Sequence, residues 1–120
     1  MKAAIILVGT ELLNGAMLDT NSLYIAEELN RIGIEIEFKL TVRDVIEEII
    51  KALDYAKKNV DLVITTGGLG PTDDDLTKEA IAKFLNKKLV VDEEEKKIFI
   101  KKYKGYKIKV SNFKEIPLPA

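Results

Sequence analysis

The residues with the clearest chemical meaning are the closely spaced glycines of the segment Gly-Gly-Leu-Gly-Pro-Thr, residues 67–72. The segment follows an apolar run and precedes a helical pattern. At such a junction, backbone N–H groups can approach an anion, and the helix start adds partial positive charge. The segment lacks the Gly-Lys-Ser/Thr ending of a Walker A loop, and Asp73 occupies the third glycine position of the dinucleotide fingerprint. It therefore predicts a phosphate-binding loop of another kind.

Acidic side chains stand in each of the three loops that we expect after the strands. Glu11 follows the first apolar run, Asp44 follows an alternating segment, and the run 73–75 follows the glycines. Carboxylates repel phosphate, and a divalent cation between them removes the conflict. The chain has no His and no Cys, so a metal must be held by oxygen ligands, which suits Mg²⁺, Mn²⁺ or Ca²⁺. We therefore expect phosphate together with a metal ion.

The same acids also have a structural interpretation. Thr72 and Asp75 have the spacing of a helix capping box, and Asp44 could be an ordinary N-cap residue worth about 1 kcal/mol. Glu11 could be a solvated loop residue. The glycine segment is harder to explain by structure alone, because each glycine costs conformational entropy and a plain strand-to-helix connection does not need three.

The elements that carry these loops can be read from hydrophobic periodicity. Residues 3–8 and 61–66 are short apolar runs, typical of strands covered on both faces. Residues 34–42 alternate apolar and polar side chains, which predicts a strand with one polar face near a sheet edge. We expect a loop over 10–19. We expect helices over 21–32, from Asp44 to Ala56, from a start within 72–75, and over 92–103. Two further short strands are expected at 89–91 and 106–110.

Alternation of strands and helices favours βαβ units, and therefore an α/β fold with a parallel sheet between helices. In such a sheet, ligands bind beyond the carboxyl ends of the strands, where the three acidic loops would meet. In the helix over 21–32, four apolar residues recur at helical spacing: Leu23, Ala26, Leu29 and Ile32. From the third helix we expect four residues to point inward: Leu76, Ala80, Ile81 and Phe84.

Composition limits the possible functions. The 120 residues are 47% hydrophobic and 32% charged, with a net charge of −1, which is typical of one globular domain over 1–120. Without Cys or His, disulfides, thiolate nucleophiles, Ser-His-Asp triads and Cys- or His-bound metals are excluded. The charge balance does not predict nucleic acid or a membrane as partner, and we expect a cytoplasmic protein. Seven Lys without an acid, from Lys96 to Lys109, indicate a solvated helix or a basic docking face.

Residues 67–77, Gly-Gly-Leu-Gly-Pro-Thr-Asp-Asp-Asp-Leu-Thr, resemble the signature of the molybdopterin-binding (MoaB/Mog-like) domain. The sequence of this segment is most similar to that of the N-terminal domain of the competence/damage-inducible CinA family. Residues 9–15 and 19–21 resemble that family's opening GTELL and DTN segments, and the similarity runs from Lys2 to Asn86. The resemblance implies a three-layer α/β/α fold around a mostly parallel sheet. It also implies a ligand that carries a phosphoanhydride.

The activity that the resemblance implies is divalent-metal-dependent hydrolysis of ADP-ribose, with Mg, Mn or Co as cofactor. Molybdenum-cofactor chemistry, by molybdopterin binding or adenylyl transfer, is an alternative, and so is a non-catalytic nucleotide-binding or oligomerisation module. We expect a small nucleotide or pterin ligand and self-association, with a dimer as the guess. The family domain continues beyond the length of this chain, so we expect its last strand and a site-lining loop to be missing here.

The site residues follow from the resemblance by position. Glu11, Asp44 and Asp75 match the functional acids of the family, as catalytic residues and metal ligands. The matching ligand-binding positions are Gly9, Thr10, Asp19, Gly67, Gly68, Leu69, Gly70, Pro71 and Thr72. Asp73 and Asp74 are expected to support the site or the helix start.

Overall fold

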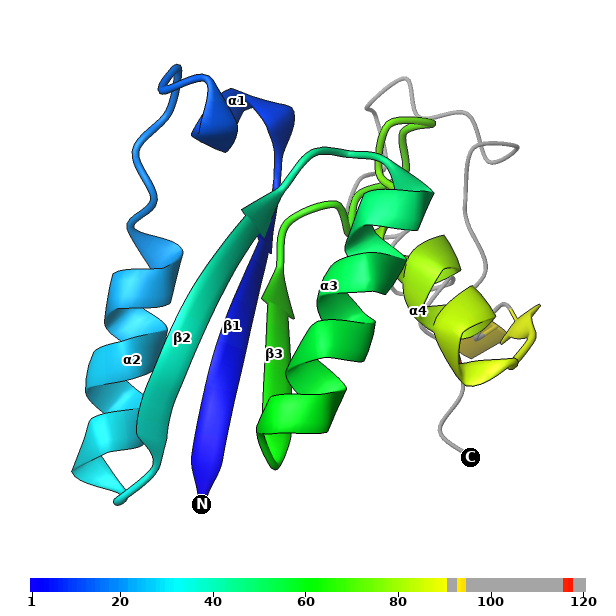
Figure 1. Cartoon of the computed structure of the whole chain (residues 1–120). Helices are drawn as coiled ribbons and strands as arrows, with labels where there is room; N and C mark the ends of the chain where they lie inside the picture. Colours follow the sequence, from blue (N-terminus) through cyan, green and yellow to red (C-terminus); the bar gives the residue numbers. More distant parts are fainter. Residues whose placement is uncertain (91–92, 95–115, 118–120) are drawn as a thin grey trace.

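The computed structural model describes residues 1–90, 93–94 and 116–117 (Figure 1). In chain order its elements are β1 (Lys2–Val8), α1 (Thr10–Leu13), α2 (Asn21–Arg31), β2 (Glu35–Val42), α3 (Ile46–Asn59), β3 (Leu62–Thr66), α4 (Thr77–Leu85), β4 (Leu89–Val90) and β5 (Ile116–Pro117). The expected strand over 106–110, the expected lysine-rich segment and nearly all of the expected helix over 92–103 lie outside the described residues.

Strands β1, β2 and β3 form a parallel sheet in the order β2-β1-β3. In this sheet Val8 of β1 lies opposite Val42 of β2, and Leu7 lies opposite Thr66 of β3. Figure 1 shows α2 on one side of the sheet and α3 and α4 on the other. The expected α/β arrangement is therefore confirmed. Because the strands are parallel, their carboxyl ends meet at one edge, where ligands bind in open sheets of this kind.

The core lies between β1 and α3, with α4 packed against α3. Every residue of β1 from Ala3 to Val8 is at most 2% exposed, as its unbroken apolar run predicts. Ile6 and Ile49 of α3 belong to one buried cluster, together with Ala56 and Ala80. These alanines are fully buried, and their small side chains let α3 pack closely against β1 and α4 against α3. The buried core therefore reaches the end of β1, where Val8 is 2% exposed.

Strand β2 has the alternating exposure that its sequence predicts. Its residues switch between exposed and half-buried from Glu35 to Val42, and β2 is an edge strand of the three-stranded sheet. The ring of Phe38 contacts Tyr55 of α3, with centroids 5.3 Å apart and planes inclined at 57°. The expected strand near residue 89 is confirmed as β4, which pairs antiparallel with β5.

Three expectations about local structure are wrong. Residues 10–13 form the short helix α1 instead of a loop, because Asn14 N donates to the carbonyl of Thr10 at 3.1 Å and closes a helical turn. Helix α3 begins at Ile46, with Val45 as its N-cap residue and no side-chain cap, so Asp44 does not open it. Helix α4 begins at Thr77, after the interval 72–75 in which a start was expected.

Exposure also departs from two expectations. Leu23 and Ile32, whose helical spacing within residues 21–32 favours a shared apolar face, are 57% and 71% exposed. All five residues of β3 are half-buried, although its apolar sequence predicts cover on both faces. In the described sheet β3 lies at an edge, which leaves its side chains more accessible than those of the central β1. Among the described helices, none has the length and apolar character that crossing a membrane requires.

Candidate ligand site at the strand ends

Hydrogen bonds tie the loop after β1 to the loop after β2. Gly9 N donates to the carbonyl of Val42 at 2.9 Å, which extends the pairing of the two strands by one residue. Thr10 donates from its backbone N at 3.3 Å and from Oγ1 at 3.4 Å to Oδ2 of Asp44. The backbone N of Asp44 in turn donates to Thr10 Oγ1 at 3.4 Å. The half-buried Asp44 carboxylate is therefore held against the first loop instead of capping α3.

The glycine loop, residues 67–70, lies directly after β3 and against the end of β1. Gly67 has φ 87° and Gly68 has φ 67°, a left-handed conformation that side-chain-bearing residues rarely adopt. A Cβ added to Gly67 would collide with the carbonyl oxygen of Val8, and one added to Gly68 would collide with Oγ1 of Thr77. Both positions therefore require glycine, for conformation and for space.

Thr77, which the sequence reasoning gave no role, anchors this loop. Its side chain is fully buried, and Oγ1 donates to the carbonyl of Gly67 at 2.8 Å while its backbone N donates to the carbonyl of Gly68 at 3.1 Å. In the described part of the chain, the N–H groups of Gly68, Leu69 and Gly70 donate no hydrogen bond to backbone or side chain. Thr77 thus fixes the carbonyls of Gly67 and Gly68, whereas these three N–H groups have no hydrogen-bond partner among the described residues.

A second anchor closes the turn that follows the glycine loop. Thr72 donates to Oδ2 of Asp75 from its backbone N at 3.1 Å and from Oγ1 at 2.5 Å, and Asp75 N donates to the carbonyl of Thr72 at 3.1 Å. The two residues thus interact as their spacing predicts, but in a turn that ends before α4 begins. Gly70 packs against this carboxylate, since a Cβ there would lie 2.6 Å from Oδ2.

Lys78 adds a positive charge to the glycine loop. Its Nζ donates to the carbonyl of Leu69 at 3.5 Å, from the first turn of α4. The sequence reasoning did not single out Lys78, although its place one residue after the Asp-Asp-Leu-Thr segment was a usable signal. A lysine beside free amides increases the attraction of this loop for an anion.

Asp19 has a structural role that its sequence motif did not indicate. Its Oδ1 accepts from the backbone N of Ser22 at 3.0 Å, and its Oδ2 accepts from Oγ of the fully buried Ser22. Burial raises the pKa of Asp19, but these hydrogen bonds, helped by Lys39 and the backbone of Asn21, outweigh it and bring the pKa below its ordinary value. The carboxylate thus fastens the start of α2, and its predicted ligand contact stays a prediction.

A cavity of about 190 Å³ lies between α1, the segment that connects α1 to α2, and the start of the glycine loop. Its lining consists of Val8, Glu11, Leu12, Met17, Leu18, Asp19, Thr20, Asn21, Thr66 and Gly67. Of the predicted functional acids, Glu11 lies in this lining, whereas Asp44 and Asp75 do not. A larger, more apolar hollow of about 440 Å³ lies between β2 and α3, and it contains none of the predicted site residues.

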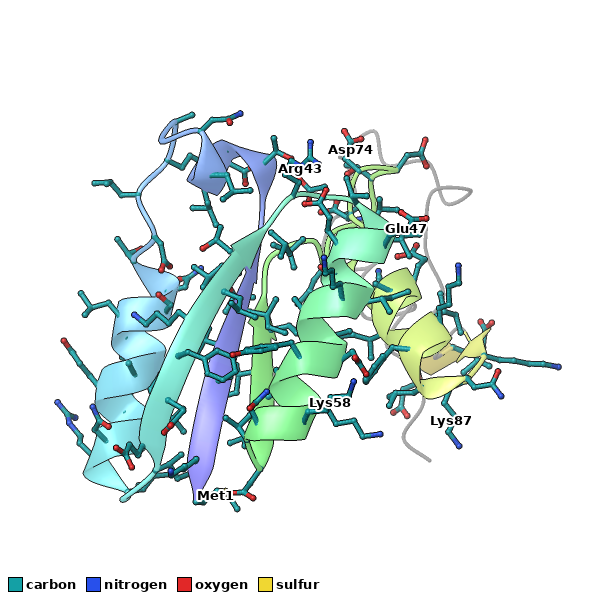
Figure 2. The ribbon with its side chains drawn as sticks, viewed as in Figure 1. Met1, Arg43, Glu47, Lys58, Asp74 and Lys87 are labelled. Carbon is teal, nitrogen blue, oxygen red and sulfur yellow. The ribbon has the colours of Figure 1, made fainter. Side chains whose placement is uncertain are left out.

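The structure does not assemble the predicted metal ligands into one cluster. Among the described residues, no three acidic side chains are placed together to hold a metal ion. Glu11 lines the cavity, Asp44 is bound to Thr10, and Asp75 is bound to Thr72. The three loops nonetheless lie at the same end of the sheet, where Figure 2 also places Arg43, Glu47 and Asp74. The catalytic and metal-binding roles of the three acids stay predictions.

Comparison with known proteins decides the family. The family described as "Probable molybdopterin binding domain" matches residues 4–113 of the chain. The chain belongs to this molybdopterin-binding domain family. Within the family it is similar to CinA proteins. A CinA-like protein of Fusobacterium nucleatum is 76% identical over 120 residues, which are 99% of this chain but 30% of that protein.

Solved structures agree on the fold of this molybdopterin-binding domain. The crystal structure of CinA from Thermoplasma acidophilum superimposes with a TM-score of 0.87 at 35% identity, over 97% of this chain and 70% of that one. The tungsten cofactor synthesizing protein MoaB of Pyrococcus furiosus has a TM-score of 0.66 at 32% identity, over 84% of this chain and 63% of that one. The resemblance that the sequence motifs indicated is therefore confirmed at the level of family and fold.

Proposed function

We propose that the domain binds a small molecule bearing a phosphoanhydride at the carboxyl ends of its strands and hydrolyses it with the help of a divalent cation. ADP-ribose-like nucleotides are the proposed substrates. The observation that carries the proposal is the glycine loop, in which two glycines with positive φ angles and the anchor Thr77 leave the amides of residues 68–70 available. Such amides, beside a helix start, suit the oxygens of a phosphate group.

The donor atoms on the three loops fit a hard cation that arrives with its ligand. Mg²⁺ is commonly held by one or two carboxylates, with substrate phosphates and water completing its shell. The absence of a three-acid cluster among the described residues is compatible with that arrangement, in which Asp44 and Asp75, with Glu11, supply some of the oxygens. When bound, the ion would offset the negative charge that develops on the phosphoryl oxygens.

The chain's own contribution is to position the groups. Thr10 orients the carboxylate of Asp44, and Thr72 orients that of Asp75. The glycine loop fixes the phosphates, because its carbonyls are tied to Thr77 and its backbone cannot rotate freely. Groups held in place before the ligand arrives avoid the cost of reorganisation during reaction.

Binding of molybdopterin, with or without adenylyl transfer, is the second candidate. The description of the matching family favours it, as do structural neighbours such as the molybdopterin biosynthesis enzyme MoaB of Thermus thermophilus, with a TM-score of 0.66 at 27% identity. The same glycine loop would then hold the phosphate of the pterin. The CinA-like sequence of residues 9–15 favours a nucleotide ligand over molybdopterin.

Hydrolysis by the 120-residue chain separates these candidates. We would incubate it with ADP-ribose and Mg²⁺, Mn²⁺ or Co²⁺ and follow AMP and ribose 5-phosphate by phosphorus NMR, with Asp75→Asn as the variant and Asp54→Asn as its matched control. Asp54 lies on the exposed face of α3, paired with Lys58 at 2.9 Å. We expect turnover by the wild type and by Asp54→Asn only. Turnover that survives Asp75→Asn unchanged would refute the assigned role, and tight binding of a pterin phosphate without turnover of ADP-ribose would favour the second candidate.

A further inference from the structure

Two apolar side chains stand in solvent beside the candidate site. Met17 is 59% exposed and Leu18 is 89% exposed, yet both line the cavity that includes Thr66 and Gly67. They belong to the segment that connects α1 and α2 beyond the ends of the strands (Figure 1). At this exposure they contribute little to the stability of the fold. Apolar side chains gathered at the rim of a cavity are typical of binding sites.

We name Met17 and Leu18 the apolar shelf. The volume of the cavity limits the size of the group that the shelf can contact. The cavity measures about 190 Å³. Sites that enclose a whole drug-sized ligand usually measure about 300–1,000 Å³, and one water takes about 30 Å³ of liquid. The cavity thus has room for one part of a nucleotide, such as a ring or a sugar, and the rest of the ligand must lie outside it.

Where Met17 and Leu18 line the otherwise largely polar cavity, their chemistry favours a ring over a sugar. The apolar shelf offers a thioether and a branched alkyl group, neither of which satisfies the hydroxyl groups of a sugar. A flat heteroaromatic ring has apolar faces, which contact Leu and Met side chains well, and polar edges. Thr20, Asn21 and Glu11, also in the lining, provide hydrogen-bonding groups for such edges.

The cavity and the glycine loop are continuous, because Gly67 belongs to both. We propose that the apolar shelf, Met17 and Leu18, holds the heteroaromatic ring of the ligand whose phosphates lie at the glycine loop. This inference rests on the proposed function and adds to it a determinant of specificity. It applies to an adenine or a pterin ring, which share this chemistry and are separated by the experiment.

Calorimetric titration tests the inference by combining a variant with shortened ligands. The probes are ADP, a pterin phosphate, ribose 5-phosphate and inorganic pyrophosphate, each with Mg²⁺. The variant is Leu18→Ser, and the matched control is Leu23→Ser, which alters a leucine that is 57% exposed and outside the cavity lining. We expect Leu18→Ser to weaken binding of one ring-bearing probe about tenfold, from the loss of one apolar contact. Ribose 5-phosphate and pyrophosphate should bind unchanged, and the urea midpoint should match that of the wild type.

Other outcomes overturn the inference in distinguishable ways. Equal weakening of all four probes by Leu18→Ser, or no weakening of any, would show that the shelf does not contact a ring. If the wild type binds pyrophosphate but gains no affinity from a ring, the inference fails and the proposed function stands. If the wild type binds none of the probes, both fail. A changed sedimentation coefficient in Leu18→Ser alone would assign the shelf to a contact between copies of the chain instead.

Discussion

Replacement of Gly68 by alanine perturbs the glycine loop at its most constrained point. The new methyl group would have to occupy the space of Thr77 Oγ1, and the backbone would have to hold a φ angle of 67°. A left-handed conformation costs an L-residue about 1–2 kcal/mol. Displacement of Thr77 would also break its hydrogen bond to Gly67, worth about 1 kcal/mol. We therefore expect the free energy of unfolding of Gly68→Ala to fall by about 2–3 kcal/mol.

Gly33→Ala is the matched control for this prediction. Gly33 also has a positive φ angle, 81°, but a Cβ there would meet nothing within 4 Å, and it lies between α2 and β2, away from the strand ends. Its substitution should cost only the conformational part, about 1–2 kcal/mol. The clash at Gly68 thus predicts a larger loss of stability than at Gly33.

Urea denaturation and calorimetric titration with pyrophosphate and Mg²⁺ measure the two consequences. We expect Gly68→Ala to weaken pyrophosphate binding at least about tenfold, because the loop amides move with Thr77, while Gly33→Ala binds as the wild type does. If the two variants lose equal stability and bind pyrophosphate equally well, Gly68 is not constrained by Thr77. Thr77 would then not be the anchor that holds the glycine loop in its binding conformation.

The remaining predictions concern three other side chains. Thr77→Val should lower the free energy of unfolding by about 1 kcal/mol in urea, since it removes the hydroxyl that binds Gly67, and Thr77→Ser should restore most of the loss. Asp44→Asn should retain the wild-type urea midpoint but hydrolyse ADP-ribose about a hundredfold more slowly, and an unchanged rate would exclude Asp44 from the site. The folded-state pKa of Asp19 is lowered, so its stabilising effect is present above the unfolded-state pKa of about 4 and is lost as the pH falls through the folded-state value. The stability difference between the wild type and Asp19→Asn, measured in urea, should therefore shrink below about pH 4, and a constant difference would contradict the pKa shift.

The fold could be predicted from the sequence because its strands differ in pattern. The continuous apolar run of β1 predicts a strand covered on both faces, and the structure has it. The strict alternation of β2 predicts a strand at an edge, which the structure also has. The glycines at 67 and 68 were equally informative, since both positions require the absence of a Cβ. Patterns of this kind report the burial and backbone conformation of the residues themselves, without identifying the partners that cover them.

The failures come from contacts between residues distant in the chain. Asp44 has the residue type and the position of a helix cap, but its carboxylate accepts hydrogen bonds from Thr10, which lies 34 positions earlier. Thr77 has no local sequence signal, because its partner, the carbonyl of Gly67, lies 10 positions away across the loop. Leu23 fits the helical period of its segment yet remains 57% exposed. Periodicity shows which residues share a face, but not whether another element covers it.

In the proposed function, the glycine loop and the loops that carry Glu11, Asp44 and Asp75 bind a phosphoanhydride together with a divalent cation. Calorimetric titration of the wild-type chain with ADP-ribose, with and without Mg²⁺, tests that claim most directly. We predict saturable binding that strengthens at least about tenfold when Mg²⁺ is present, because the ion offsets repulsion between the phosphates and the carboxylates. Equal affinity with and without Mg²⁺, or no binding in either condition, would contradict it.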